Sequence, residues 1–218
     1  MKWRLIPKDA AKKPKHGKYY WHWKDDLADE GFNQCVYCAI HESSFGRRNY
    51  HIEHFKPKSI EEFQHLIHEY GNLYFACCIC NCFKASYWEE PKNDFSNSAF
   101  PNPSQIDYSQ LFQINEDATI SGKNVTGNFI IHKLYLNRPQ LVLERKLRSL
   151  NLRIESLIQD FADCKSLLFE KLNSGDKRSN RYLQAMMDGY ENLHLIRNKV
   201  AKTIPYTSAD TKRQNDAS

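Results

Sequence analysis

The sequence predicts an α+β protein, in which a small finger of two strands and a helix is followed by a mainly α-helical region. Two Cys-x-x-Cys pairs, Cys35/Cys38 and Cys77/Cys80, stand on either side of a 38-residue insert. Two short apolar runs of strand length lie in that insert, the second leading directly into the second pair. Beyond residue 140, apolar residues recur at alternating spacings of 4 and 3, which is typical of packed helices.

Composition limits the class of protein. Of the 218 residues, 41% are hydrophobic and 26% are charged, which suffices for one sizeable core or two small ones. No apolar run reaches the roughly 18 residues that span a bilayer, and the first residues lack the apolar stretch of a signal peptide. We therefore expect a cytoplasmic protein with no membrane partner. In that reducing compartment, the seven cysteines are expected to bind metal rather than form disulfides.

Residues 1–34 are expected to form a basic arm followed by a short helix. Seven of the first 18 residues are Lys or Arg, and only Asp9 is acidic. Pro7 to Lys18 therefore has the character of a flexible contact for phosphates, although a solvated tail would have the same composition. Trp21 to Glu30 has helical character and is followed by Gly31, a common residue just beyond a helix.

Residues 35–110 are the predicted core of the finger. Asn49 to Phe55 and Leu73 to Ala76 are the expected strands, and Pro57 follows the first of them. Residues 88–110 are rich in Pro, Asn and Ser, and are expected to form a loop.

A helix is expected between the two strands. Ser59-Ile60-Glu61-Glu62 has the pattern of a capping box, which opens a helix. This helix is expected to run to about Tyr70, where Gly71 ends it, with Phe63, Leu66 and Ile67 on one face.

Residues 111–204 are expected to form a helical region, and residues 205–218 a polar, disordered tail. Pro139 is well placed at a helix start, and Asn173-Ser174-Gly175 at its end. A second amphipathic segment, Ser179 to Lys202, follows, so the simplest structure is an antiparallel helical hairpin. The helices either bury their apolar stripes against each other or leave part of the seam for a partner subunit. The seam of the first helix comprises Leu143, Leu147, Leu150, Ile154, Leu157, Phe161, Cys164 and Leu168.

The two Cys-x-x-Cys pairs predict a metal site. Each such turn aims two thiolates at one point, so two turns complete a tetrahedral, structural zinc site with no position left for water. Cys78 and Cys82 leave the register open, because they can form a second pair of their own. The preferred ligands, whose spacing is the same in both pairs, are Cys35, Cys38, Cys77 and Cys80.

The finger also carries the residue types that phosphodiester hydrolysis requires. An imidazole can deprotonate water at neutral pH, and His54 is the candidate. An amide oxygen bonded to the ring N–H holds the imidazole in one tautomer, and Asn72 is the candidate for that task. Glu53 and Asn81 are the candidates for holding a divalent cation through oxygen, which favours Mg²⁺ or Mn²⁺. Adjacent strand residues point to opposite faces, so Glu53 and His54 share a site only if the strand end is twisted.

Taken together, these residues resemble the zinc-bound HNH endonucleases, in which two strands and a helix form a ββα-metal finger. The resemblance implies that His54 is the general base, that Asn72 orients it, and that Glu53 and Asn81 bind the catalytic ion. Glu53 stands where aspartate is usual and Asn81 where the last histidine is usual, but both keep an oxygen ligand. The matching motifs are Cys35-x2-Cys38, Glu53-His54-Phe-x-Pro57, Asn72-Leu73 and Cys77-x2-Cys80-Asn81-x2-Lys84.

Residues 1–150 are also similar, with less specificity, to the PtuB-like HNH subunit of the Septu and retron anti-phage defence systems of bacteria. This similarity implies DNA as the substrate and a partner ATPase of the PtuA type that holds or licenses the nuclease. It rests on Trp3-Arg4, the long insert between His54 and Asn72, Phe100-Pro-Asn-Pro103, Leu134 to Arg138, Leu141 and Arg145.

Four basic residues are candidates for contact with the DNA backbone. Arg47 and Arg48 precede the first strand, Lys56 follows it, and Lys84 lies one turn into the predicted finger helix. Any surface Lys or Arg has the same signature, so position and charge are the whole argument.

Three further groups have both a functional and a structural interpretation. His51 is either an alternative base or phosphate contact, or a solvent-facing strand residue. The aromatic run Tyr19 to Trp23 can stack on bases, but packing of its helix onto the finger is the favoured explanation. His65 and His68 have a helical spacing that permits joint metal binding, but a polar helix face is favoured because no third ligand is apparent.

The sequence leaves two classes of function. The expected one is a metal-dependent HNH endonuclease that cleaves DNA within an anti-phage complex, with residues 140–202 as the docking surface for its partner. The alternative is a non-catalytic zinc-ribbon module that binds nucleic acid or acts as an adaptor. A pure binding ribbon has no need for His54, Asn72 and Asn81 together, which favours the enzyme.

Overall fold

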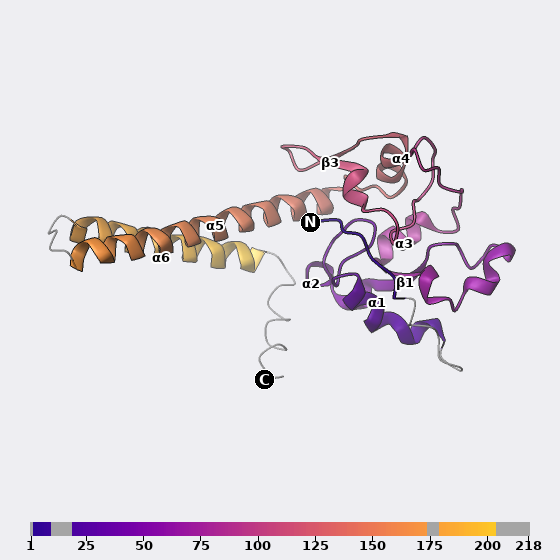
Figure 1. Cartoon of the computed structure of the whole chain (residues 1–218), viewed down its shortest axis with the longest axis horizontal. Coiled ribbons are helices and arrows are strands. Elements are labelled where there is room, and N and C mark those ends of the chain that lie inside the picture. Colours follow the sequence, from indigo (N-terminus) through magenta and orange to yellow (C-terminus); the bar gives the residue numbers. More distant parts are fainter. Residues whose placement is uncertain (1, 10–18, 174–178, 204–218) are drawn as a thin grey trace. The chain divides into compact units, whose positions relative to one another are not determined.

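The computed structural model describes residues 2–9, 19–173 and 179–203, and the chain divides into two compact units, residues 1–144 and 145–218. The described residues form helices and two small two-stranded sheets, so a mixed fold of this kind is confirmed (Figure 1). No helix in the described segments is long and apolar enough to cross a membrane.

The centre of the first unit is a two-stranded sheet followed directly by a helix. Strand β1 (Tyr50–His54) pairs antiparallel with β2 (Leu73–Cys77), so that Tyr50 lies opposite Cys77 and His54 opposite Leu73. All five residues of β2 are buried, which matches its continuous apolar sequence. Helix α3 (Cys78–Lys84) begins at the next residue. Both strands therefore form close to their predicted bounds.

Short helical segments surround this sheet. The predicted helix at Trp21 to Glu30 is present as a 3₁₀ turn (Tyr20–Trp23) that continues into α1 (Lys24–Glu30), and Gly31 caps its end. The stretch before β1 contains α2 (Glu42–Phe45) and a 3₁₀ turn (Arg47–Asn49).

The helix predicted from Ser59 to Tyr70 is wrong. Only a 3₁₀ helix (Glu61–Leu66) and a 3₁₀ turn (Tyr70–Asn72) form there. The predicted capping box does not form either. The residue that precedes the 3₁₀ helix is Ile60 and not Ser59, and no side chain caps the start of this helix.

Tertiary contacts explain why this helix stops early. The carbonyl group of Leu66 accepts a hydrogen bond from the side chain of Asn72, and that of Ile67 lies 3.1 Å from the ring of His54. In a longer helix these carbonyls would bond to backbone N–H groups four residues on. Here the carbonyl of Leu66 accepts from the N–H of Glu69, three residues on, and from Asn72, and the carbonyl of Ile67 faces His54.

The domain boundary expected at residue 110 does not coincide with the boundary between the two units, which falls after residue 144. After a 3₁₀ turn (Tyr108–Gln110), β3 (Phe112–Ile114) and β4 (Ile120–Gly122) form a hairpin, and α4 (Val125–Lys133) follows. These elements belong to the first unit, because their apolar side chains enter its core. Leu111, Ile130, Leu134 and Leu136 are fully buried there.

The described amino-terminal residues, 2–9, pack against the rest of the first unit. Trp3 and Ile6 are buried, and the Trp3 ring N–H donates to the carbonyl oxygen of Tyr37 at 2.8 Å. The ammonium group of Lys8 forms an ion pair with Glu30 at 2.6 Å. The rest of the predicted arm, residues 10–18, lies outside the described residues.

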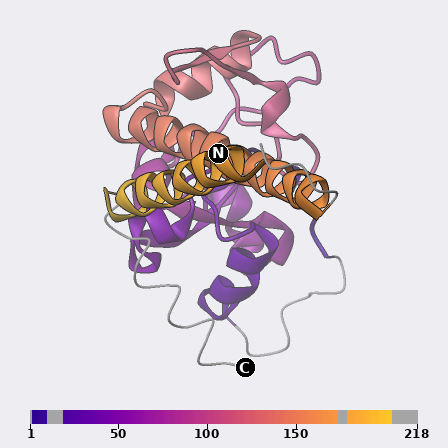
Figure 2. The same cartoon turned by 90° about the vertical axis from the view of Figure 1, so that its left-hand side faces the viewer.

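The second unit contains the predicted antiparallel hairpin. Helix α5 (Pro139–Asn173), which begins in the first unit, and α6 (Ser179–Thr203) lie side by side (Figures 1 and 2). A methyl group added at Gly189 of α6 would lie 3.1 Å from the ring of Phe161, so the helices are in close contact there. The predicted tail, residues 205–218, lies outside the described residues.

Candidate metal centre and the polar site beside it

Four buried thiols meet in the core of the first unit. The Sγ atoms of Cys35, Cys38, Cys77 and Cys80 all lie within 4.8 Å of one another, and those of Cys38 and Cys77 are 3.8 Å apart. A tetrahedral zinc ion with Zn–S bonds of about 2.3 Å separates its ligands by about 3.8 Å. The cluster therefore fits a metal such as zinc, as the cysteine spacing predicts.

Two local structures hold the thiols in place. The first is a tight turn, in which the N–H of Ala39 donates to the carbonyl of Cys35 at 2.8 Å and the N–H of Cys35 donates to Ile40 at 2.9 Å. The second is the junction of β2 and α3, where the Sγ of Cys77 accepts from the N–H of Cys80 at 3.5 Å. One pair thus comes from a loop and the other from a helix start.

The structure also resolves the register of the cysteine-rich segment. Cys77 and Cys80 enter the buried cluster, whereas Cys78 is half-buried and Cys82 is exposed. A helix rotates by about 100° per residue, so Cys78 and Cys82 share the face of α3 that points away from the cluster.

The charge of the cluster requires a cation. Burial raises the pKa of the Cys35 thiol well above its usual range, so thiolates persist here only beside positive charge. Arg138 supplies part of it, because its guanidinium group donates to the Sγ of Cys80 at 3.9 Å. Burial lowers the pKa of Arg138, but the thiolate charges of Cys80, Cys38 and Cys77 outweigh that effect and raise it. A metal ion would neutralise the remainder.

His54 ends β1 and is 7% exposed. Its Nε2 lies 3.1 Å from the carbonyl oxygen of Ile67, and the ring of Tyr20 packs edge-on at 4.8 Å. A carbonyl oxygen can only accept, so Nε2 carries the proton and Nδ1 keeps a lone pair. Burial, with a contribution from the charge of Lys58, lowers the pKa of His54 to about 4 despite the opposing bond to Ile67. The ring is therefore neutral at neutral pH.

The sequence led us to expect a bond between Asn72 and the ring of His54. Asn72 bonds instead to the backbone of the segment that carries Ile67, the partner of His54. Its side-chain oxygen accepts from the N–H of Lys56 at 2.8 Å. Its NH₂ group donates to the carbonyls of Lys56 at 3.1 Å and Leu66 at 3.3 Å. Asn72 thus fixes the backbone that follows His54, and it positions the Ile67 carbonyl through the adjacent Leu66.

Glu53 lies on the opposite side of β1 from His54 and is 2% exposed. Its Oε1 atom contacts the ammonium group of Lys84 at 2.6 Å and the hydroxyl of Tyr37 at 3.1 Å. Burial raises the pKa of Glu53, although the charge of Lys84 opposes this. The carboxylate proposed from sequence as a metal ligand is thus held in a buried ion pair.

The expectation that Lys84 contacts the DNA backbone is not met by this arrangement. Lys84 is completely buried, and besides Glu53 its ammonium group donates to the carbonyl oxygen of His54 at 3.1 Å. A buried ammonium offers no surface to a phosphate. Lys84 instead ties the end of α3 to the end of β1.

Asn81 lies on α3 and lines an open pocket of about 440 Å³. His51 of β1 lines the same pocket, whereas His54 does not. The remaining lining residues come from α3 and are Cys78, Ile79, Cys82 and Phe83.

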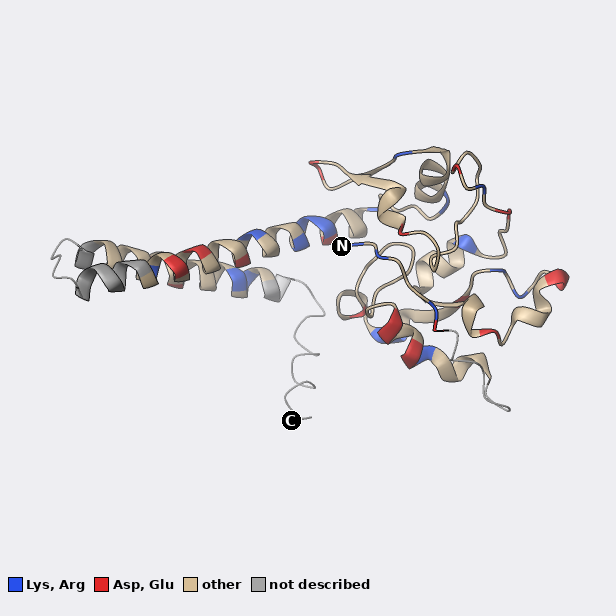
Figure 3. Ribbon diagram, in the orientation of Figure 1, with Lys and Arg blue, Asp and Glu red and all other residues tan. Residues whose placement is uncertain are grey.

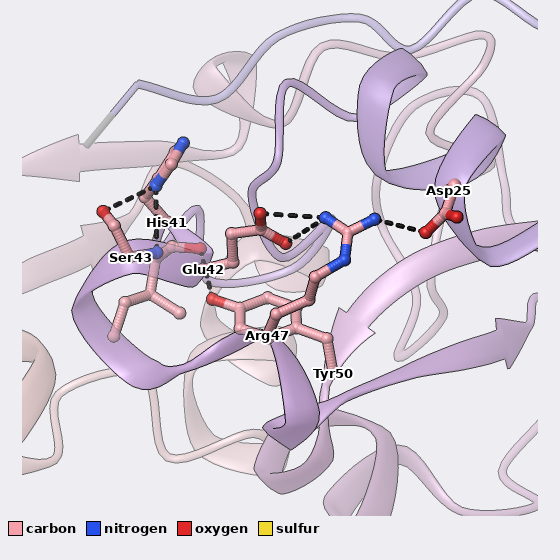
Figure 4. Close-up of polar contacts among 7 residues, drawn as sticks. Asp25, His41, Glu42, Ser43, Arg47 and Tyr50 are labelled. Atoms are coloured by element: carbon pink, nitrogen blue, oxygen red, sulfur yellow. Dashed lines mark hydrogen bonds and ion pairs between the residues drawn. The ribbon is translucent and has the colours of Figure 1, made fainter. Parts of the chain in front are cut away.

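The other candidates for DNA contact differ in whether neighbouring side chains already engage their charged groups. The guanidinium group of Arg47 is held by Glu42 on one side and Asp25 on the other (Figure 4). Arg48 is exposed. The ammonium group of Lys56 lies 5.0 Å from the ring centres of both Phe63 and Trp88. Arg48 is thus the candidate best placed to meet a phosphate, since acidic side chains already hold Arg47 and aromatic rings flank Lys56.

The aromatic run combines packing with exposure. Trp23 is buried and Tyr20 packs on His54, in accord with the structural interpretation. Tyr19 and Trp21 are 51% and 52% exposed, and their rings stack on each other at 4.3 Å. The residue next to both of them, Tyr20, contacts His54, so an exposed aromatic surface lies close to the candidate base.

Three functional neighbours had no signal in the sequence. Ile67 contributes only its backbone carbonyl to His54, and no residue type marks such a role. Tyr37, inside the first Cys-x-x-Cys turn, bonds to Glu53, and Arg138 reaches the thiols from 58 residues beyond Cys80. All three contacts are long-range, so only the folded chain reveals them.

Comparison with known proteins identifies no relative: no protein-family model, no curated protein and no solved structure matches the chain.

Proposed function

We propose that this chain is a metal-dependent HNH endonuclease that hydrolyses DNA, with His54 as its general base. One observation carries the proposal: the ring of His54 is neutral, and its Nε2 is occupied by the carbonyl of Ile67. An imidazole held in this way has a fixed tautomer and a lone pair on Nδ1 that can accept a proton from water.

In the proposed reaction, Nδ1 of His54 accepts a proton from a water molecule. The resulting hydroxide attacks phosphorus, and the bond from phosphorus to the 3′-oxygen breaks. Tyr19 and Trp21 offer a stacking surface for a base beside the scissile bond, and Arg48 a contact for the backbone.

A divalent ion, Mg²⁺ or Mn²⁺, is the proposed cofactor of this step. When bound, such an ion stabilises the negative charge on the leaving oxygen. Asn81 offers an amide oxygen at an open pocket, which suits a hard cation. Glu53 does not line that pocket, and both the Lys84 and Tyr37 contacts engage its Oε1, so it would offer a cation only Oε2, after a rearrangement that brings it to Asn81.

The test is plasmid cleavage by the purified chain, alone and with an ATPase of the PtuA type, in Mg²⁺ or Mn²⁺. His54→Ala should lower the cleavage rate by at least about 10²-fold, the usual contribution of a general base. Its zinc content should stay that of the wild type, because His54 does not contact the thiols.

His65→Ala provides the matched control, since His65 is an exposed histidine of the 3₁₀ helix that follows β1. It should cleave at the wild-type rate. Cleavage by His54→Ala at that same rate would refute the assignment.

A second candidate, a non-catalytic zinc module that binds nucleic acid, is favoured by the ion pair of Glu53 with Lys84. A carboxylate neutralised in this way is a poor ligand unless the pair opens. Titration of the zinc-loaded chain with Mn²⁺ distinguishes the nuclease from the binding module. Binding that Asn81→Ala abolishes supports the enzyme, whereas DNA affinity without such binding supports the module.

We also propose that the hairpin docks an ATPase subunit, the partner that the resemblance implies. The seam of α5 splits into two rows with different exposure. Ile154 is 4% exposed and Phe161 lies against α6, whereas Leu150 and Leu157 are 43% and 46% exposed. Two helices alone cannot enclose both rows, so one row is available to a partner.

A further inference from the structure

The open pocket beside α3 contains an unusual set of donor atoms. Its lining includes the imidazole of His51, the amide of Asn81 and the thiols of Cys78 and Cys82. The four-cysteine cluster uses neither thiol, and the proposed reaction uses neither thiol nor His51. No carboxylate lines this pocket.

The positions of these donors follow from the secondary structure. Cys78 and Cys82 are separated by four residues on α3, so their side chains lie one above the other on one helix face. His51 lies on β1, opposite Ala76 and next to the start of α3. The pocket between them is open and has a volume of about 440 Å³, large enough for an ion with a water molecule.

The chemistry of these thiol and imidazole donors favours zinc or a transition metal over magnesium. Two ligands at i and i+4 on a helix, with a third from a neighbouring element, is a recurrent arrangement for zinc. Thiolate and imidazole ligands select zinc and related ions, whereas Mg²⁺ needs oxygen. Two cysteines and one histidine make a three-ligand set that leaves the fourth position open to water or substrate.

We infer that Cys78, Cys82 and His51 form a second metal site, which binds Zn²⁺ or a similar thiophilic ion with one open coordination position. Among the described residues, only the four-cysteine cluster has its ligand atoms within 4.8 Å. The three donors of the second site must therefore rotate toward one another. His51 and Cys82 are exposed and Cys78 is half-buried, so rotation does not disturb the core.

This inference does not depend on nuclease activity. Asn81 lines the same pocket, so an ion at the second site would lie beside a proposed ligand of the catalytic ion. The two sites therefore need to be separated by measurement.

The test is titration of the full-length, zinc-loaded chain with Co²⁺ under reducing conditions, after weakly bound metal has been removed by dialysis. Thiolate ligands give bound Co²⁺ an intense charge-transfer absorption in the near ultraviolet. We expect one additional equivalent of Co²⁺ with this absorption. His51→Ala should weaken its binding at least about tenfold, and Cys78→Ser/Cys82→Ser should abolish the absorption.

Matched controls exist for both residue types. Cys164→Ser changes an exposed cysteine of α5, and His65→Ala an exposed histidine outside the pocket, so both should titrate like the wild type. Alkylation of Cys78 and Cys82, mapped by mass spectrometry, should be slowed by Cd²⁺ in the wild type and not in His51→Ala.

Absence of an additional equivalent would overturn the inference. So would an equivalent that His51→Ala binds with the wild-type affinity, or a near-ultraviolet absorption that persists in the double serine variant. His54→Ala separates this result from the proposed function, because it should lose cleavage and keep the Co²⁺ signal. A chain that binds Co²⁺ in this way but never cleaves DNA would refute only the nuclease.

Discussion

At the scale of single residues, the first unit depends on polar side chains that are buried and fully engaged. His54, Asn72, Glu53 and Lys84 are each less than 10% exposed. A buried polar group costs free energy unless it is paired, so each of them makes specific contacts with the backbone or with another side chain. Substitution of one partner should therefore affect both stability and the site.

Asn72→Ala should destabilise the first unit by about 2–4 kcal/mol, because it removes the partners of the N–H and the carbonyl of Lys56 and one of the two bonds to the carbonyl of Leu66. DNA cleavage should fall as well, since the Ile67 carbonyl would no longer be held against His54. Denaturant unfolding and cleavage assays check the two effects. Asn72→Asp, which keeps the bond from the Lys56 N–H, should be less destabilised than Asn72→Ala. Equal losses in both variants would contradict this role for the side-chain oxygen.

Lys84→Met should destabilise the protein by about 3–5 kcal/mol at neutral pH, because it leaves the charge of Glu53 buried and unpaired. The double variant Lys84→Met/Glu53→Gln should recover part of this loss. The measurement is the free energy of unfolding of the wild type, the single variant and the double variant.

The deficit of Lys84→Met should also depend on pH. Burial already raises the folded-state pKa of Glu53 above its unfolded value, and loss of Lys84 removes the largest opposing effect. A carboxyl whose folded pKa is raised loses stability as pH rises through that range. The deficit should therefore be smaller at about pH 5 than at about pH 8, and a deficit independent of pH would contradict the buried pair.

At the scale of elements, the four-cysteine cluster joins two segments that lie far apart in the sequence. One pair of thiols comes from the turn after α1, and the other from the junction of β2 and α3. The sheet has only two strands, and two strands alone are marginally stable in water. A metal ion bound by the four thiols would therefore add stability that the small sheet cannot supply by itself.

We expect one structural zinc per chain after mild chelation, and Cys80→Ser should lose it. Because binding of a structural zinc is worth about 10–16 kcal/mol in small finger peptides, the metal-free first unit should fail to fold. Metal analysis and near-ultraviolet circular dichroism provide the measurements. Cys78→Ser is the matched control, since its thiol lies two residues away and outside the cluster. Zinc lost from Cys78→Ser and kept by Cys80→Ser would reverse the assigned register.

At the scale of the whole chain, the described part of the hairpin carries many exposed apolar side chains. Besides Leu150 and Leu157, the exposed residues include Tyr182, Leu195 and Ile196. Charges are banded along α5, with basic residues near its start and acidic ones further along (Figure 3). The basic band comprises Lys146, Arg148 and Arg153, and the acidic band Glu155, Asp160 and Asp163. A partner that covers the exposed row of Leu150 and Leu157 must carry charges complementary to the basic and the acidic band.

Leu150→Glu/Leu157→Glu should abolish co-purification with a co-expressed ATPase of the PtuA type, because it places charge in the exposed row. Leu152→Glu, at a residue 61% exposed outside that row, should have no effect. Light scattering of the chain alone provides the second readout. A dimer that the double variant dissociates would show that a second copy, and not the ATPase, occupies the row. Retention of the complex by the double variant would refute the docking surface.

The sequence by itself determined the features that depend on local spacing. Two Cys-x-x-Cys pairs suffice to predict the cluster, because the turn geometry is contained in four residues. Strands β1 and β2 and helices α5 and α6 follow from their own periodicity, with the bounds of the hairpin marked by Pro139 and Asn173. These elements need no information from distant parts of the chain.

Only the tertiary structure decided the features that depend on distant partners. The segment from Ser59 has a helical sequence, yet side chains of Asn72 and His54 take its carbonyls and the helix stops. Lys84 resembles a surface lysine in sequence, but the buried carboxylate of Glu53 holds it in the core. The base of the proposed reaction was recognisable from its residue type; its orientation by the Ile67 carbonyl was not, because a backbone group carries no mark in the sequence.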